Sequence, residues 1–334
     1  MGKIAIHGFG RIGRTLQRIG LQRNLFTAAA ISDIKDGPTL AALFEVDTNY
    51  GRWHEPVTGA ADHLVIGGRT IPYYDAMKEL PPWGDLGIDL VVDCTGRATA
   101  RPGAQAHLDR GAKRVLVSAP SKSKADCDAF LLPGINAETF DPAKDRIISI
   151  ASCTTNALAP VVKVLREAFG IQYGLFTTVH AYTNTQSLTD QPMKDRRDSW
   201  AAAENVIPSS SGAAKALGYI WPGLKITGKA YRVPVRTGSI VELNAMTEKV
   251  VTVEAVNDAF RQAAGQAPLQ GIMAVLEGEW PSARIVGDSH SSLVDLPLTM
   301  VQDERLLSVA AWYDNEYGFT ARLAEMAAML AEYP

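Results

Sequence analysis

The chain has 334 residues, 46% of them hydrophobic and 21% charged, and its formal net charge is −3 at pH 7. This length holds two domains with full cores, and the composition is ordinary for a soluble globular protein. No long block of one charge occurs, and no apolar run approaches the ~20 residues of a membrane span, so neither nucleic acid nor a membrane is expected as principal partner. Three cysteines without metal-ligand spacing, and no signal segment ahead of the first strand, predict a metal-free protein of the reducing cytoplasm.

The first elements predict a dinucleotide site. An apolar strand over residues 3–7 leads into Gly8, Gly10 and Gly13 in G-x-G-x-x-G spacing, and a helical pattern follows. The glycines make a tight turn that admits a pyrophosphate to the helix N-terminus.

A second apolar run, residues 28–31, leads to Asp33, twenty residues beyond Gly13. An acidic residue at this distance meets the ribose hydroxyls of a bound dinucleotide. Its carboxylate would repel a 2′-phosphate, so NAD is favoured over NADP, although Lys35 lies two residues further on.

Residues 1–150 alternate short apolar runs with helical patterns, which predicts parallel strands crossed by helices. Further buried strands are expected over residues 90–92, 115–117 and 147–150.

Cys153 follows the last of these runs and precedes a helical pattern. The residue therefore lies where a strand ends and a helix begins, facing free N–H groups and the positive end of the helix dipole. Both favour the thiolate, which is the nucleophilic form of cysteine. A small buried hydrophobic residue is the alternative interpretation.

Beyond Cys153 the strand runs become longer and several alternate with period two, which predicts a mixed or antiparallel sheet with helices on one face. His180 ends one of them, at the start of a polar stretch. A thiolate can add to an aldehyde, and a histidine can take the hydroxyl proton while hydride passes to NAD. The runs are residues 173–179, 239–246, 291–301 and 306–312, and residues 321–330 predict a final helix.

Seven stretches carry a resemblance to a known family, in family order and across nearly the whole chain. They are residues 8–14, 117–122, 151–156, 177–181, 212–216, 232–234 and 312–318. With these motifs the chain resembles the phosphorylating glyceraldehyde-3-phosphate dehydrogenases of type I. The resemblance implies NAD-dependent oxidative phosphorylation of glyceraldehyde 3-phosphate to 1,3-bisphosphoglycerate, through a cysteine thiohemiacetal and thioester.

The same resemblance implies an α/β fold. A Rossmann-type parallel-sheet domain for NAD is expected over residues 1–152, and an α+β catalytic and oligomerisation domain with a mostly antiparallel or mixed sheet over residues 153–317. A C-terminal helix at about 318–334 would pack back on the first domain. The implied partners are a small phosphorylated aldehyde and inorganic phosphate, in a cytoplasmic homotetramer whose loop 181–206 lines a neighbouring subunit's cofactor pocket.

Residue roles are carried over by position. Cys153 is implied as nucleophile and His180 as base, and Thr183 and Arg232 would bind the substrate phosphate. The attacking inorganic phosphate would meet Ser152, Thr154, Ser211 and Gly212, with Arg197 nearby. The cofactor would contact Gly8, Gly10, Arg11, Ile12, Gly13, Asp33 and Ser118, and Asn315 would orient the nicotinamide carboxamide.

Five positions depart from the family pattern. His7 and Ser32 each replace an asparagine, and Ala157 replaces a frequent second cysteine. Trp200 stands where a basic residue is usual, and residues 235–238 read Val-Arg-Thr-Gly instead of Thr-x-Asn-Val. Exact substrate identity therefore stays open between glyceraldehyde 3-phosphate and another phosphorylated aldose such as erythrose 4-phosphate, and arsenate could replace phosphate. Two further interpretations are an enzyme in which water hydrolyses the thioester and a cofactor-binding protein without catalysis.

Overall fold

The computed structural model describes residues 2–77 and 79–333. By its internal contacts the chain forms two compact units. Unit 1 comprises the residues up to Pro133, Ala137–Ala151 and the residues from Thr320 onward, and unit 2 comprises Gly134–Asn136 and Ser152–Phe319. Within the described residues, none of the helices combines the length and apolar character needed to cross a bilayer.

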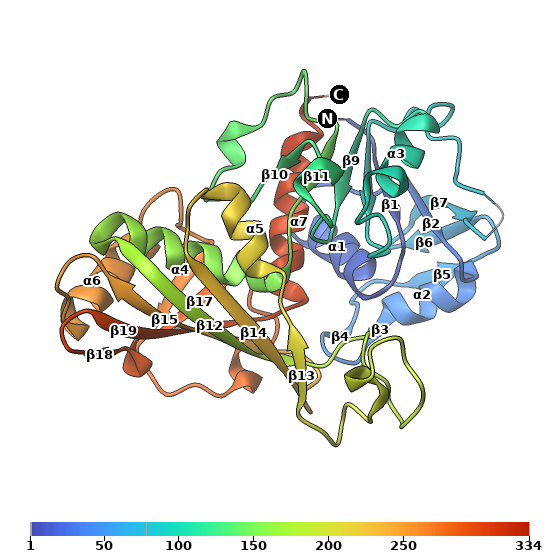
Figure 1. The fold of residues 1–334 in the computed structure, drawn as a ribbon. Helices are drawn as coiled ribbons and strands as arrows, with labels where there is room; N and C mark the ends of the chain where they lie inside the picture. Colours follow the sequence, from blue (N-terminus) through green and yellow to red (C-terminus); the bar gives the residue numbers. More distant parts are fainter. Residues whose placement is uncertain (1, 78, 334) are drawn as a thin grey trace. The chain divides into compact units, whose positions relative to one another are not determined.

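Unit 1 is built on a nine-stranded sheet in the order β10-β11-β9-β8-β1-β2-β7-β6-β5 (Figure 1). All pairs from β10 to β7 are parallel, and β6 and β5 extend the sheet as antiparallel strands. This confirms the predicted Rossmann-type sheet, while the antiparallel edge was not predicted. The strands are β1 (Ile4–His7), β2 (Ala30–Asp33), β5 (Val57–Gly59), β6 (His63–Ile66), β7 (Arg69–Asp75), β8 (Leu90–Asp93), β9 (Arg114–Val117), β10 (Ala129–Phe130) and β11 (Ile147–Ser149).

The helices of unit 1 are α1 (Arg11–Gln22), α2 (Gly37–Glu45), α3 (Arg101–Asp109) and most of α7 (Tyr317–Leu330), with a short ribbon of β3 (Val46–Asp47) and β4 (Gly51–Arg52) and 3₁₀ turns at Lys124–Asp126 and Ala137–Thr139. The chain directly after α7 is hydrogen-bonded to the segment before β1, because the Gly2 N–H donates to the Ala331 carbonyl at 2.6 Å.

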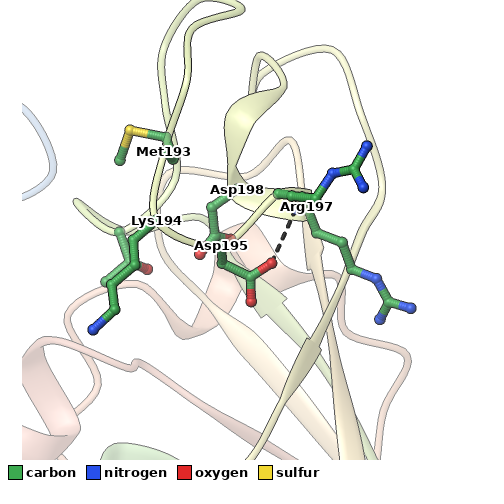
Figure 2. A pocket seen from close by; sticks show the side chains of 7 residues that line it. Met193, Lys194, Asp195, Arg197 and Asp198 are labelled. Atoms are coloured by element: carbon green, nitrogen blue, oxygen red, sulfur yellow. Dashed lines mark hydrogen bonds between the residues drawn. The ribbon is translucent and has the colours of Figure 1, made fainter.

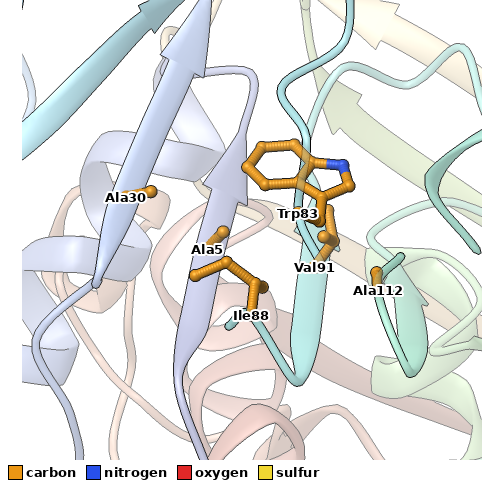
Figure 3. Close-up of a cluster of buried hydrophobic side chains, with 6 residues drawn as sticks. All are labelled: Ala5, Ala30, Trp83, Ile88, Val91 and Ala112. Carbon is orange, nitrogen blue, oxygen red and sulfur yellow. The ribbon is translucent and has the colours of Figure 1, made fainter. Parts of the chain in front are cut away.

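Small residues on inner strands of the sheet, and Ala112 just before β9, make room for an indole. Ala5, Ala30, Val91 and Ala112 are buried around Trp83 (Figure 3). The Trp83 side chain is fully buried, and its Nε1–H donates to His107 Nδ1 at 3.1 Å. The indole thus fills the space that the alanines leave without burying an unpaired donor.

Unit 2 contains an eight-stranded mixed sheet in the order β13-β14-β12-β15-β19-β17-β16, with β18 paired to β19. Helices α4, α5 and α6 pack on its strands (Figure 1). The strands are β12 (Ile171–Ala181), β13 (Ile207–Ser210), β14 (Ile226–Val233), β15 (Ser239–Thr247), β16 (Met273–Leu276), β17 (Ser292–Asp295), β18 (Met300–Gln302) and β19 (Leu306–Tyr313). The helices are α4 (Cys153–Phe169), α5 (Ala213–Ile220) and α6 (Val253–Ala264), with 3₁₀ turns at Arg197–Ser199, Ser282–Ile285 and Leu296–Leu298.

Strand β12 alternates along its length. Phe176, Thr178 and His180 are buried, whereas Leu175 and Val179 are exposed at 63% and 40%. Because side chains alternate between the faces of a strand, His180 lies on the same face as Thr178. Helix α4, which begins at Cys153, packs on this strand.

The prediction of one continuous strand over residues 291–301 is wrong. The structure divides it into β17 and β18, separated by the 3₁₀ turn Leu296–Leu298. Pro297 lies in the first turn of that segment. Proline has no N–H to donate to a ladder, so an inner strand cannot continue through it.

Candidate active site

Cys153 is the first residue of α4 in unit 2. Ser152 caps the helix, because its Oγ accepts the Thr155 N–H at 3.1 Å. Ala151 before it is buried with a φ of 59°, a left-handed conformation that costs about 1–3 kcal/mol for a residue other than glycine. The backbone turns sharply here, between the end of β11 and the helix, and places the thiol at the helix N-terminus as expected from the sequence.

His180 contacts the thiol directly. Its Nε2 lies 3.4 Å from Cys153 Sγ, and its Nδ1 lies 2.6 Å from the Ala181 carbonyl oxygen. A carbonyl oxygen only accepts, so a proton on Nδ1 leaves Nε2 with a lone pair directed at the thiol. The imidazole is therefore oriented to take the proton of Cys153.

Arg232 approaches the other side of the imidazole from β14, where it is paired in register with His180. Its Nη1 lies 2.5 Å from His180 Nδ1 and 3.3 Å from the Ala181 oxygen. Guanidinium only donates, so Nδ1 can either donate to the carbonyl or accept from Arg232. In the second arrangement Nε2 carries the proton and donates to a thiolate, so the two tautomers suit the two states of Cys153.

Burial dominates the electrostatics of this pair. Burial, and then the Arg232 guanidinium, lower the pKa of His180 to about 3, against the hydrogen bond to Ala181. Burial also raises the pKa of the Cys153 thiol, although Arg232 and hydrogen bonds from Thr154 act in the opposite direction. Arg232 and the hydrogen bonds at the helix N-terminus therefore favour the thiolate, whereas desolvation opposes it and has the larger effect on the pKa of Cys153.

Tyr313 is a site residue that the sequence reasoning missed. Its buried hydroxyl lies 3.0 Å from Thr154 Oγ1 and 2.8 Å from Thr178 Oγ1, and Thr178 donates to the Ile240 carbonyl at 3.0 Å. Its ring packs edge-on against that of His180. Tyr313 follows Trp312 in the last matching stretch, and that position was the only signal of its role in the sequence.

The residues predicted for the phosphates are only partly brought together. Ser152 is engaged in capping α4 and Thr154 in the contact with Tyr313. Ser211 Oγ accepts the N–H of Ala213, the first residue of α5, at 3.3 Å, and the N-cap residue Gly212 contributes no side-chain cap.

Arg197 and Thr183 lie on the loop between β12 and β13. In the described part of the chain the Arg197 side chain makes neither a hydrogen bond nor an ion pair, so the structure does not join it to the other predicted phosphate ligands. Thr183 instead bonds with Thr185 and Gln186.

The glycine turn of unit 1 fits a dinucleotide. Gly8 has a φ of +87°, and a Cβ on Gly13 would lie 2.1 Å from the Gly8 carbonyl oxygen. A Cβ on Gly10 would meet nothing within 4 Å. Helix α1 has no side-chain cap at its N-cap residue Gly10, and the N-terminus of a helix favours an anion such as a pyrophosphate.

Asp33 is fixed at the end of β2. Its Oδ2 accepts the Phe9 N–H at 2.6 Å and its Oδ1 the Lys35 N–H at 3.0 Å. Each carboxylate oxygen keeps a lone pair for a ribose hydroxyl. These residues therefore suit the adenosine side of NAD.

The remaining predicted cofactor residues differ in their surroundings. Arg11 is held by a bidentate pair with Asp47 at 2.8 and 3.1 Å, and Ile12 follows it in α1. The Ser118 N–H donates to the Asp93 carbonyl at 3.0 Å. Asn315 belongs to unit 2, where its Oδ1 accepts from the Gly238 N–H and the Ser239 hydroxyl at 3.1 and 3.0 Å, which leaves its amide N–H groups to donate elsewhere.

Half-buried His7 and the buried residues Asp93 and His107 form a cluster whose ligand-type atoms lie within 4.8 Å of one another. The Trp83 N–H can only donate, so His107 Nδ1 is an acceptor and His107 Nε2 carries the proton that it shares with Asp93 at 3.1 Å. Neither nitrogen of His107 then offers a free lone pair to a metal. Burial lowers the pKa of His7 to about 4, and its Nδ1 lies 2.7 Å from Ser32 Oγ.

Comparison with known proteins agrees with both halves of this description. Residues 2–101 match the NAD binding domain of glyceraldehyde 3-phosphate dehydrogenase, and residues 152–315 match its C-terminal domain. The chain is 46% identical to a glyceraldehyde-3-phosphate dehydrogenase of Kitasatospora aureofaciens, covering 99% of each chain. It is 44% identical to that of Geobacillus stearothermophilus over 98% of each chain, and 43% identical to that of Streptomyces coelicolor over 97% of each. The chain therefore belongs to the glyceraldehyde-3-phosphate dehydrogenase family of NAD-dependent oxidoreductases that act on aldehydes.

Proposed function

We propose that this enzyme oxidises glyceraldehyde 3-phosphate and captures the acyl group with inorganic phosphate, forming 1,3-bisphosphoglycerate. The observation that carries the proposal is the Cys153 Sγ to His180 Nε2 distance of 3.4 Å at a helix N-terminus. Nucleophile and base within this reach are the arrangement that covalent catalysis requires. NAD, when bound, supplies the acceptor for the hydride.

The first step uses the thiol of Cys153 and the imidazole of His180. His180 Nε2 takes the thiol proton as Sγ bonds to the aldehyde carbon, and it then returns that proton to the resulting oxyanion, which becomes the hydroxyl of a thiohemiacetal. His180 then removes that hydroxyl proton while the hydride leaves the same carbon, which gives a thioester on Cys153. Two electrons leave the substrate with the hydride, so the carbon rises from the aldehyde to the acid oxidation level.

Arg232 links substrate binding to base strength. Its guanidinium lowers the pKa of His180, and it is also the proposed ligand of the substrate phosphate. A phosphate dianion beside Arg232 would offset that positive charge, so it would raise the basicity of His180 when the substrate arrives. The base would therefore become effective in the complex that needs it.

The second step is phosphorolysis. The proposed anion site consists of Ser211, Gly212 and the start of α5, with Ser152 and Thr154 near the thiol. An oxygen of bound phosphate attacks the thioester carbon, and the sulfur leaves as thiolate and recovers the proton that His180 took from the hydroxyl. Holding phosphate next to the carbon lowers the barrier because a bimolecular step becomes effectively intramolecular.

The test is NADH formation with glyceraldehyde 3-phosphate, erythrose 4-phosphate and unphosphorylated glyceraldehyde, each with and without phosphate or arsenate. We expect the highest kcat/KM for glyceraldehyde 3-phosphate and a saturable dependence on phosphate, with arsenate as a substitute. Full-rate turnover without either anion would mean that water resolves the thioester. A higher kcat/KM for erythrose 4-phosphate would move the assignment to the four-carbon substrate.

Assembly and location stay predictions: a homotetramer in the cytoplasm. Light scattering of the purified chain with NAD tests the first, with four chains per particle as the expected result.

A further inference from the structure

The loop between β12 and β13 turns a carboxylate, rather than an arginine, toward Thr183. This loop contains an open pocket of about 740 Å³ lined by Thr185 and residues 193–198. Figure 2 shows the Arg197 side chain extending away from Asp198. Arg197 bonds through its backbone N–H to Asp195 Oδ1 at 3.0 Å, whereas Asp198 is partly buried and points to Gln186.

Gln186 connects Asp198 to Thr183. Its side chain is buried, and its Nε2 donates to Asp198 Oδ1 and to Thr185 Oγ1, both at 2.9 Å. Its Oε1 accepts the Thr183 N–H at 2.9 Å and the Thr183 hydroxyl at 3.3 Å. A carboxylate only accepts and a backbone N–H only donates, so the orientation of this amide is fixed by its partners.

This network has two effects on Thr183. Gln186 occupies the N–H donor of Thr183, and Gln186 and Thr185 engage its hydroxyl, so both donors that Thr183 would otherwise offer to a phosphate are occupied. The negative charge of Asp198 is also only two hydrogen bonds away. Among the residues that the structure describes, no salt bridge neutralises Asp198, even though Lys194, Arg196 and Arg197 are exposed in the same loop.

We propose that Asp198, acting through Gln186, is a specificity-determining residue that weakens the binding of a doubly charged phosphate group at Thr183. The proposal rests on the proposed function, in which Thr183 binds the substrate phosphate. It acts on binding and not on the thiol chemistry. Its signature is therefore a change in KM for the phosphorylated aldehyde at nearly constant kcat.

The experiment compares Asp198→Asn with Asp195→Asn in the full-length enzyme with saturating NAD and phosphate. Both variants remove one carboxylate charge from the same loop, but only Asp198 is linked to Thr183. At low ionic strength, Asp198→Asn should lower KM for glyceraldehyde 3-phosphate by about 3–10-fold, and the gain should shrink at high salt. Asp195→Asn should leave KM unchanged, and Asp198→Glu, which keeps the charge, should behave as the unmutated enzyme.

Unphosphorylated glyceraldehyde is the substrate control, and its KM should be equal in all four enzymes. An unchanged KM for glyceraldehyde 3-phosphate in Asp198→Asn, or an equal fall for both aldehydes, would overturn the inference. A fall that appears only in the KM for inorganic phosphate would assign Asp198 to the other anion and would also overturn it. An unmutated enzyme with the same KM for both aldehydes would contradict the proposed function itself, and the inference would fall with it.

Discussion

The glycine turn of unit 1 and the thiol site of unit 2 are specified in different ways. In unit 1 the features lie close together in sequence and depend mainly on the backbone, through the Gly8 φ of +87° and the 2.1 Å approach at Gly13. In unit 2 the proposed reacting and positioning groups are side chains of Cys153, His180, Arg232 and Tyr313, which come from α4, β12, β14 and β19. A local pattern can therefore reveal the first site, whereas the second depends on how a mixed sheet brings distant strands together.

Removing the thiol tests this difference between the two units most strongly. Cys153→Ser should reduce turnover by ~10³-fold or more, because the serine hydroxyl ionises far less readily than a thiol. NAD binding should persist, since its proposed adenosine contacts lie in unit 1. Steady-state kinetics and a calorimetric titration with NAD measure the two properties. Turnover above a few per cent of the unmutated rate would show that Cys153 is not the nucleophile.

A complementary change disrupts unit 1. Gly13→Ala places a Cβ against the Gly8 carbonyl, so we expect a loss of stability of about 3 kcal/mol and loss of NAD binding. Gly10→Ala is the matched control, because its Cβ meets nothing in the free protein. It should unfold at the same urea concentration as the unmutated chain while binding NAD more weakly. Equal unfolding midpoints for both variants would contradict this account of Gly13.

A substitution at Asp33 tests the explanation of why NAD is preferred over NADP. Asp33→Ala should narrow the preference for NAD over NADP by roughly ten- to a hundredfold, because one charge contact is worth about 1.5–3 kcal/mol. The ratio of kcat/KM values for the two cofactors measures it. An unmutated enzyme that uses both cofactors equally would argue against a role for this carboxylate.

Each unit also carries one histidine with a lowered pKa, and this predicts a shared acid sensitivity. The folded-state pKa is about 4 for His7 and about 3 for His180, below the ordinary 6.5, so between these values the unfolded chain binds protons that the folded chain does not. The contribution of these histidines to the free energy of unfolding is therefore fully present above about pH 6.5 and is lost as the pH decreases toward 4. For the buried His180 the loss is on the order of 1–2 kcal/mol by pH 5.

Urea unfolding at pH 7 and pH 5 measures this effect. His7→Asn should reduce the difference between the free energies of unfolding at these two pH values. The same pH dependence in His7→Asn and the unmutated chain would mean that His7 does not contribute.

Short sequence patterns predicted the parallel strands, the glycine turn and the strand-to-helix position of Cys153. The break at Pro297 also had a local signal, which the apolar run on either side concealed. Tyr313 lies in a matching stretch, but its role, like that of Gln186, comes from contacts that only the folded sheet and loop create. The raised pKa of Cys153 was missed for a related reason: sequence shows the helix N-terminus but not the burial that outweighs it.

The most direct test of the central claim is a rapid-mixing experiment with enzyme, NAD and glyceraldehyde 3-phosphate in the absence of phosphate and arsenate. Cys153 should become acylated once, so NADH should appear in a burst equal to the number of active sites and then nearly stop. Mass spectrometry of the quenched protein should place the acyl group on the peptide that contains Cys153, and added phosphate should restart turnover. Linear NADH formation without a burst, or an acyl group absent from Cys153, would contradict the account.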